Sequence, residues 1–336
     1  MGDHTTLRHG GGLDDAIRRY GGRRADWLDL STGISPFSYP FAPPAAATYE
    51  RLPEQHQLDA LLAAARAAYQ VPDDGGMVAA PGTQALIQML PTLMPLGKVV
   101  VDPLGYQEHG RCWRLAGHEV VEADDPLSAA LDNLDVRYAT IIHPHNPSGA
   151  WADAKLVFEA AEALFARGGL LIIDEAFCDG APDRSFVPSL PAGAIVLRSF
   201  GKFYGLAGIR VGFAVGAPQL TERLAVQFGP WAVPGPALCI ARGALADSAW
   251  RSAISARLLR SAQLLAAALE EAGFELVGMT DLFVTVRHPN AVAIEQHLAE
   301  RHILVRGFDQ ATALLRFGLP IDDHERQRLV QALIAL

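Results

Sequence analysis

The chain has 336 residues, of which 50% are hydrophobic and 19% are charged, and its formal net charge at pH 7 is -9. A chain of this length can bury a large core, and we expect it to divide into a major and a minor domain. The acidic balance excludes a nucleic-acid partner, since phosphate backbones require a concentrated basic face, and no apolar run reaches the ~18 residues that a membrane span needs.

The three cysteines, Cys112, Cys178 and Cys239, are widely spaced and form no CxxC motif. Their spacing argues against a disulfide framework and against a metal site, and we expect each to be a small buried hydrophobic residue. Unpaired cysteines and the lack of a charged-then-apolar signal peptide indicate a cytoplasmic protein.

Three segments are expected along the chain. Residues 1–45 form a Gly- and Pro-rich N-terminal arm that belongs to the small domain and contains one short helix, Leu13–Tyr20. Residues 46–230 form the major domain, and residues 231–336 form the C-terminal small domain.

Helices and short strands are predicted to alternate in the major domain. Apolar residues recur at helical spacing from Leu58 to Tyr69, and runs such as Val99–Val101 and Glu119–Val121 alternate with helices between Gly82 and Val215. This is the pattern of βαβ units around a largely parallel sheet.

Polar residues appear where several of these elements begin or end. Pro81-Gly82-Thr83-Gln84 opens an apolar helix, and free N–H groups at a helix start bind phosphate together with a hydroxyl. The strand Ala139–Ile142 runs into a turn that contains Asn146. The buried strand Gly169–Ile173 delivers Asp174 and Glu175 at its C-terminal end, where ligands bind in open α/β sheets.

Lys202 lies in the segment Ser199–Arg210, directly after the apolar strand Gly193–Leu197. An amine that forms a Schiff base must be held rigidly at a strand end and be partly desolvated. Ser199 and Arg210 place a hydroxyl and a guanidinium within reach of a phosphate ester. The pattern predicts a pyridoxal phosphate site, and the alternative is an ordinary strand-turn with a surface lysine.

The other polar segments favour the cofactor site. Asp174 is the candidate partner of the pyridine nitrogen, since a carboxylate there keeps the ring protonated as an electron sink. The Asn146 amide is expected to face the phenolic oxygen of the ring. The candidate phosphate ligands are Gly82, Thr83, Gln84, Ser199 and Arg210.

The chain changes character after the major domain. Gly229–Pro236 breaks the helix pattern and marks a candidate hinge. The Ala-, Leu- and Arg-rich stretch from Trp250 to Ala272 then predicts one long helix that leads into a C-terminal α+β domain.

The order of phosphate-binding helix, Asn turn, Asp strand and Lys turn resembles the fold-type I pyridoxal phosphate enzymes, the aspartate aminotransferase superfamily. The likeness covers nearly the whole chain and is strongest to histidinol-phosphate aminotransferases and to the threonine-phosphate decarboxylases of cobalamin synthesis. It implies an α/β fold with a mostly parallel sheet in the major domain and a smaller α+β domain. It also implies pyridoxal 5'-phosphate as the cofactor and a homodimer.

The resemblance also assigns roles to single residues. Tyr106 is at the place where this superfamily stacks an aromatic ring on the cofactor, and the alternative is an aromatic that caps the following helix. Arg316 is expected to bind the substrate α-carboxylate, and Arg306 a second substrate anion. For both arginines the alternative is the solvent face of an edge strand. Together with Lys202 and Asp174, Tyr106 is a candidate catalytic residue.

The N-terminal motif separates the two closest families. His9-Gly10-Gly11, followed by Asp29–Pro36, resembles the opening of the cobalamin-pathway decarboxylases, and backbone amides of its glycines would cradle a substrate phosphate. The candidate substrate residues are His9, Gly10, Gly33, Ile34, Asn146, Arg306 and Arg316.

Two departures from the aminotransferase pattern matter. Leu52-Pro53 stands where histidinol-phosphate aminotransferases usually have Tyr-Pro, which removes an aromatic substrate contact. Phe177 stands where many aminotransferases have Tyr, which removes a hydroxyl that would hydrogen-bond a cofactor oxygen.

The resemblance therefore implies decarboxylation of a phosphorylated amino acid, L-threonine O-3-phosphate, to (R)-1-aminopropan-2-yl phosphate in cobalamin synthesis. A histidinol-phosphate aminotransferase is the alternative. A catalytically inactive binding or regulatory protein is disfavoured, because Lys202, Asp174, Asn146 and Arg210 are all present.

Overall fold

The computed structural model describes residues 9–334, which separate into two compact units. The large unit contains Phe37–Asn146 and Ala150–Ser255, and the small unit contains, among the described residues, 9–36, Pro147–Gly149 and 256–334. These bounds differ from residues 45 and 230, at which the sequence analysis divides the chain. The second bound differs because helix α10 (Gly235–Ala246) packs against helix α3 (Gln55–Tyr69) of the large unit, and helix α11 (Ser248–Glu271) then continues from the large unit into the small unit.

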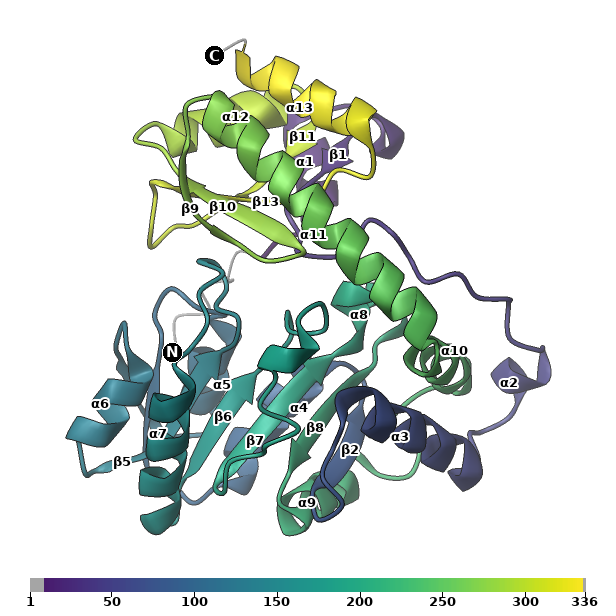
Figure 1. Ribbon diagram of the computed structural model, residues 1–336, viewed down its shortest axis with the longest axis vertical. Helices are drawn as coiled ribbons and strands as arrows, with labels where there is room; N and C mark the ends of the chain where they lie inside the picture. The colour runs from purple at the N-terminus through teal and green to yellow at the C-terminus, as the bar shows by residue number, and fades with distance from the viewer. Residues whose placement is uncertain (1–8, 335–336) are drawn as a thin grey trace. The chain divides into compact units, whose positions relative to one another are not determined.

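The large unit, all of whose residues are described, is built on a seven-stranded sheet (Figure 1). The strand order is β2-β8-β7-β6-β5-β3-β4, and β8 alone runs antiparallel to the other six strands. The mostly parallel sheet expected from the sequence is therefore confirmed. The strands are β2 (Gly76–Ala80), β3 (Lys98–Val101), β4 (Glu119–Glu122), β5 (Val136–Ile142), β6 (Leu170–Asp174), β7 (Ala194–Ser199) and β8 (Gly212–Gly216).

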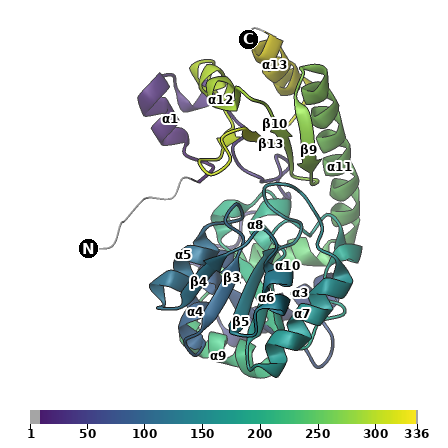
Figure 2. The same cartoon turned by 90° about the vertical axis from the view of Figure 1, so that its left-hand side faces the viewer.

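Helices cover both faces of this sheet, because parallel neighbours can be joined only by crossover connections. Figures 1 and 2 show α4 and α5 on one face and α6 and α7 on the other. The core between them consists of the apolar strand residues, such as Val99, Ile172 and Leu197, packed against helix residues such as Leu86. The helices are α2 (Ala47–Glu50), α3 (Gln55–Tyr69), α4 (Thr83–Leu93), α5 (Glu108–Leu115), α6 (Pro126–Asp132), α7 (Ala154–Ala166), α8 (Phe200–Phe203), α9 (Pro218–Phe228) and α10 (Gly235–Ala246).

The parallel strands deliver their C-terminal ends to one edge of the sheet. Ile142 on β5 lies beside Asp174 on β6, and Asp174 lies beside Leu197 on β7. The His143 N–H donates to the Asp174 carbonyl at 2.8 Å, which holds the start of the Asn146 turn against the end of β6. The three segments that carry Asn146, Asp174 and Lys202 therefore leave the sheet side by side.

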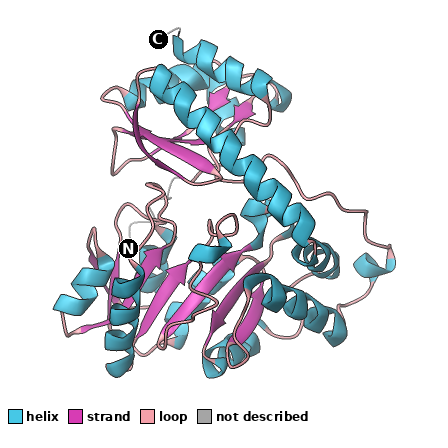
Figure 3. Cartoon of the chain, viewed as in Figure 1, coloured by secondary structure: helices cyan, strands magenta, loops and turns pink. Residues whose placement is uncertain are grey.

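The small unit combines helices with antiparallel strands (Figure 3). Within its described residues, a four-stranded antiparallel sheet has the order β12-β13-β10-β9, and β1 pairs with β11 in parallel. Its elements are α1 (Leu13–Tyr20), β1 (Leu28–Asp29), β9 (Glu275–Met279), β10 (Phe283–Arg287), α12 (Ala291–Glu300), β11 (Ile303–Leu304), β12 (Arg306–Gly307), β13 (Leu314–Gly318) and α13 (Asp323–Ile334).

The expectation that all cysteines are buried is wrong for one of them. Cys112 and Cys178 are buried, but Cys239 on α10 is exposed, because its position on the helix faces away from the packed side that carries Leu238 and Ile240. Across residues 9–334, the helices lack the combination of length and apolar composition that would let one cross a bilayer.

Candidate active site

Two glycines allow three segments of the large unit to meet at the start of α4. Gly82 has a φ of +83°, which favours glycine, and a Cβ there would overlap the guanidinium of Arg210. A Cβ at Gly212 would lie 2.5 Å from the Thr83 nitrogen, and Ser199 lies opposite Gly212 in the β7–β8 pair. N–H groups at a helix start, two hydroxyls and a guanidinium are thus gathered at one place, and this donor set fits a phosphate ester.

Lys202 lies on a single helical turn, α8, that begins directly after β7. Gly201 permits this turn to pack closely, because a Cβ there would lie 2.7 Å from the Cα of Ala207. Lys202 is half-buried, and its Nζ lies 4.9 Å from the centroid of the buried Phe177 ring. The ring shields one side of the amine from water, as a nucleophilic lysine requires.

Asp174 is a buried carboxylate that is held by two hydrogen-bond donors. His109 Nε2 lies 2.9 Å from Asp174 Oδ2, and the Ala176 N–H donates to Oδ1 at 3.0 Å. Burial by itself would raise the pKa of Asp174, but the hydrogen bond and charge of His109, with the charge of Lys202, hold it below its usual value. The carboxylate is therefore ionised at neutral pH, which fits a partner for a protonated pyridine nitrogen.

Tyr106 is fixed by a chain of hydrogen bonds. Its hydroxyl donates to Gln84 Oε1 at 2.9 Å, and Gln84 Nε2 donates to the buried Glu108 carboxylate at 2.9 Å. Burial, followed by the charges of Glu108 and Asp174, raises the pKa of Tyr106, so its phenol stays protonated. Tyr106 precedes α5 without belonging to it, and its stacking on a cofactor ring stays a prediction.

The other candidate residue of the large unit, Asn146, is half-buried in the turn that follows β5. Its predicted contacts with the cofactor and with the substrate stay predictions. The large unit thus carries all nine cofactor residues predicted from the sequence: Gly82, Thr83, Gln84, Tyr106, Asn146, Asp174, Ser199, Lys202 and Arg210.

The N-terminal motif lies in the small unit and contacts the segment that contains Ser31. The Gly11 N–H donates to Ser31 Oγ at 2.7 Å, and a Cβ at Gly10 would overlap the Ser31 carbonyl. The same carbonyl accepts a hydrogen bond from Arg316 Nη2 at 3.0 Å. The exposed His9-Gly10 arm and the buried Arg316 are therefore joined through one residue, and Gly33 and Ile34 lie two and three positions after that residue.

Arg306 and Arg316 lie opposite each other on β12 and β13. β13 is flanked by β12 and β10, and Arg316 is only 6% exposed, so the alternative of a solvent-facing arginine on an edge strand is wrong for Arg316. Burial, and then the neighbouring charge of Arg306, lower the pKa of Arg316 to about 9. An anion between two such cations would remove this electrostatic cost.

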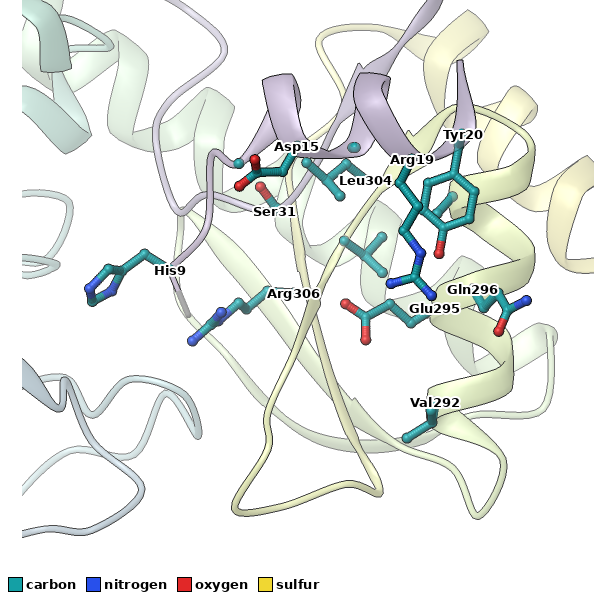
Figure 4. A pocket seen from close by; sticks show the side chains of 14 residues that line it. His9, Asp15, Arg19, Tyr20, Ser31, Val292, Glu295, Gln296, Leu304 and Arg306 are labelled. Carbon is teal, nitrogen blue, oxygen red and sulfur yellow. The ribbon is translucent and has the colours of Figure 1, made fainter. Parts of the chain in front are cut away.

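A cavity of about 370 Å³ opens in the small unit beside these residues. His9, Ser31 and Arg306 line one part of it, and Arg19 and Glu295 line another (Figure 4). His9 of the N-terminal arm and one of the two arginines, Arg306, therefore line the same cavity.

Sequence reasoning missed His109 and Glu108, the residues that fix Asp174 and Gln84. Both follow Tyr106 closely in the sequence, and the His109 N–H donates to the Tyr106 carbonyl at 3.0 Å, so one turn separates the side chains of Tyr106 and His109. A histidine and a glutamate at the buried start of a helix that follows a parallel strand were the available signal.

The model of the family "aminotransferase class I and II" matches residues 45–333. Threonine-phosphate decarboxylase from Pseudomonas aeruginosa is 44% identical, with 98% of this chain and 97% of the relative covered. The threonine-phosphate decarboxylase from Sinorhizobium sp. is 42% identical, with 97% of each chain covered.

The fold is also similar to that of solved structures. The histidinol-phosphate aminotransferase from Clostridium acetobutylicum superposes with a TM-score of 0.81 at 19% identity, covering 91% of this chain and 98% of that one. At this level of identity the likeness concerns the fold, which agrees with the α/β architecture of the two units.

Proposed function

Because the chain belongs to the aminotransferase class I and II family, we propose that it is a pyridoxal phosphate enzyme that decarboxylates L-threonine O-3-phosphate to (R)-1-aminopropan-2-yl phosphate. Similarity over almost the full length of two threonine-phosphate decarboxylases supports this substrate. The proposed product belongs to cobalamin synthesis, and we place the enzyme in the cytoplasm.

The large unit provides the residues that would hold the cofactor. Lys202 would bind its aldehyde carbon, Asp174 would face its pyridine nitrogen, and the donors around Thr83 and Arg210 would hold its phosphate. When bound, pyridoxal phosphate supplies a protonated ring that accepts the electron pair of a bond broken at the substrate Cα.

Each of these side chains has a defined task in the proposed reaction. The ionised Asp174 keeps a proton on the ring nitrogen, and His109 keeps Asp174 ionised through its hydrogen bond. Lys202 supplies the amine, and Phe177 shields one side of it from water. Tyr106 keeps its own proton, because burial and the charges of Glu108 and Asp174 raise its pKa, and its hydroxyl donates a hydrogen bond to Gln84.

The observation that carries the substrate class is the facing pair of arginines in the small unit. Threonine phosphate has two anionic groups, a carboxylate and a phosphate monoester, and binding both requires two cationic or amide-rich sites. Arg306 and Arg316 lie opposite each other, and the glycines of the His9 arm add backbone amides next to Ser31. Holding both anions orients the substrate so that one chosen bond at Cα is cleaved.

The test is an assay for carbon dioxide with threonine phosphate as substrate. We expect one carbon dioxide per turnover, no conversion of the cofactor to pyridoxamine phosphate, and a raised KM in His9→Ala. Stoichiometric pyridoxamine phosphate on mixing with histidinol phosphate, with no gas from threonine phosphate, would establish the aminotransferase instead.

A homodimer is the second part of the proposal. In the large unit, an apolar cavity of about 530 Å³ is lined by residues that include Pro53, Val226 and Pro230. The neighbouring Leu52 and Trp231 are exposed although both are large and apolar. Exposed apolar surface around a hollow is typical of a protein interface, and a second copy of this chain is the partner we propose.

A further inference from the structure

A buried arginine joins the ends of the two strands that carry Asp174 and Ser199. Arg198 Nη1 donates to Glu175 Oε2 at 2.6 Å, and its Nη2 lies 3.2 Å from Asp179 Oδ1. The three side chains of this triad (Arg198, Glu175 and Asp179) are 2%, 0% and 5% exposed. The planar guanidinium therefore binds two carboxylates at once inside the protein.

The triad lies behind the candidate cofactor residues. β6 and β7 run parallel with Asp174 beside Leu197, and side chains alternate between the two faces along each strand. Asp174 and Ser199 thus share one face of the sheet, whereas Glu175 and Arg198 share the other. The ion pair between Glu175 and Arg198 therefore fixes the distance between the ends of β6 and β7, and it does so on the face of the sheet opposite to Asp174.

The triad also holds the segment that contains Phe177. Glu175 and Asp179 bracket this segment, and the Phe177 ring lies 4.9 Å from Lys202 Nζ. Glu175 is fixed further, because it accepts hydrogen bonds of 2.6 Å from the Ser185 hydroxyl and from a backbone N–H. Arg198 therefore anchors both ends of the segment that places Phe177 beside Lys202.

The surroundings of the triad argue that stability is not its main contribution. The Tyr69 ring packs on the Arg198 guanidinium at 4.4 Å. Among the described residues, four buried polar atoms of the triad and its neighbours make no hydrogen bond: Asp179 Oδ2, Arg198 Nε, Tyr204 OH and Arg251 Nε. Burying such atoms opposes folding, and replacing a buried ion triad by neutral residues is often neutral or stabilising.

We propose that Arg198 is a positioning residue, which acts through Glu175 and Asp179 to fix the strand ends and the segment that hold the cofactor. The inference rests on the proposed pyridoxal phosphate site and deepens it. Without Arg198 the chain still has every residue that would bind the cofactor, but the positions of these residues are no longer fixed. The effect should therefore appear in cofactor affinity and spectrum while the fold is kept.

The decisive variant removes all three charges together. Arg198→Met, Glu175→Gln and Asp179→Asn in one chain leave no unpaired buried charge, so we expect a melting temperature close to that of the wild type. The dissociation constant for pyridoxal phosphate should rise about tenfold and kcat should fall about 100-fold, since small displacements suffice. The pH midpoint of the cofactor's visible absorption should shift, and hydrogen exchange of residues 175–179 should be faster in the cofactor-free protein.

Arg167→Met is the matched control. Arg167 donates from Nη1 to partly buried backbone, at 2.9 Å to the Ala130 carbonyl, but it precedes β6 and so lies at the strand end opposite to Asp174. This variant should keep the wild-type cofactor affinity, absorption midpoint and exchange of residues 175–179.

The outcomes separate the positioning role from the proposed function. A folded triple variant with wild-type affinity, absorption midpoint and exchange would overturn the role of Arg198. If the triple variant does not fold, Arg198→Lys decides, because one ammonium keeps the charge but lacks the fork that reaches both carboxylates; wild-type readouts there would overturn the role equally. If the wild-type protein binds no pyridoxal phosphate, the proposed cofactor is wrong, whatever the role of Arg198.

Discussion

The Nζ atom of Lys202 lies 4.9 Å from the centroid of the Phe177 ring, and this ring has no group that donates a hydrogen bond. Phe177→Tyr adds a hydroxyl at this place. A hydroxyl that donates to the cofactor oxygen favours the deprotonated form of the bound cofactor. We therefore expect Phe177→Tyr to lower the pH midpoint of the visible absorption, as measured by spectrophotometric titration of the holoenzyme.

Phe158→Tyr provides the control for this titration. Phe158 lies on α7 and is 41% exposed, so its new hydroxyl would face solvent and the midpoint should not move. A midpoint that rises or stays unchanged in Phe177→Tyr would show that residue 177 does not reach the cofactor oxygen.

Lys202 should be the lysine that binds the cofactor covalently. Lys202→Ala should abolish turnover and the visible band that borohydride removes from the wild type, because the amine nucleophile is lost. The labelled peptide from the reduced wild type should contain residue 202. A label on any other lysine would contradict the assignment, and Lys155→Ala, a change on the exposed surface of α7, should leave the band intact.

The hydrogen bond between His109 and Asp174 predicts a pH dependence. The pKa of Asp174 is depressed in the folded protein, so its contribution to stability is present above the ordinary carboxyl pKa and is lost as the pH falls through the depressed value. His109→Phe removes the donor while burial remains, so the pKa of Asp174 should rise. The loss of pyridoxal phosphate affinity on the acid side should then begin at higher pH.

The acid limb of cofactor binding, measured from pH-dependent dissociation constants, checks this prediction. An acid limb that is the same in His109→Phe and in the wild type would show that another group keeps Asp174 ionised.

Asp174→Asn should lower the rate by orders of magnitude while the fold is kept, because the proton on the ring nitrogen is no longer held.

The positions of the candidate residues Asp174 and Lys202 were predictable because Asp174 ends a buried strand and Lys202 follows one. The apolar runs before Asp174 and Lys202 mark buried parallel strands, and such strands deliver their C-terminal residues to one edge of the sheet. The sequence order of the strands suffices for this expectation, since it needs no knowledge of side-chain packing.

Contacts between distant side chains were not predictable in the same way. His109 meets Asp174 across 65 positions of the chain, and no local spacing relates the two residues. The burial of Arg316 depends on β13 being flanked on both sides, whereas alternation along one strand does not say whether that strand is central. The helical turn at Lys202 likewise depends on the close approach of Ala207 to Gly201.

The apolar surface around Leu52 predicts how the proposed homodimer is disrupted. Leu52 and Val226 are 64% and 76% exposed, and Val226 lines a cavity whose other lining side chains are mostly apolar. Leu52→Asp combined with Val226→Asp would bury two charges in the interface, so light scattering should show a monomer mass in place of a dimer mass. Leu134→Asp is the matched control, because Leu134 is 77% exposed after α6, outside this surface.

A wild-type protein that is monomeric at working concentration would contradict the homodimer. A double variant that stays dimeric would place the interface elsewhere on the chain.

Arg316→Met should separate substrate binding from stability. Burial and the charge of Arg306 lower the pKa of Arg316 to about 9, so the folded protein binds this proton less tightly than the unfolded chain does. The free energy of unfolding therefore rises with pH between about 9 and the ordinary pKa of arginine. Below about 9 the charged Arg316 lowers this free energy by a constant amount. A neutral side chain removes this cost, although the variant also loses the hydrogen bond to Ser31. At pH 7 the ligand-free variant should therefore melt no lower than the wild type.

The KM for threonine phosphate should rise roughly 30-fold or more in Arg316→Met, as expected for about 2 kcal/mol or more when one partner of a buried charge pair is removed. Arg287→Met on the neighbouring strand β10 is the control, since Arg287 is exposed and paired with Glu275, and its KM should not change. Calorimetry with steady-state kinetics measures both quantities, and an unchanged KM in Arg316→Met would remove Arg316 from the substrate site.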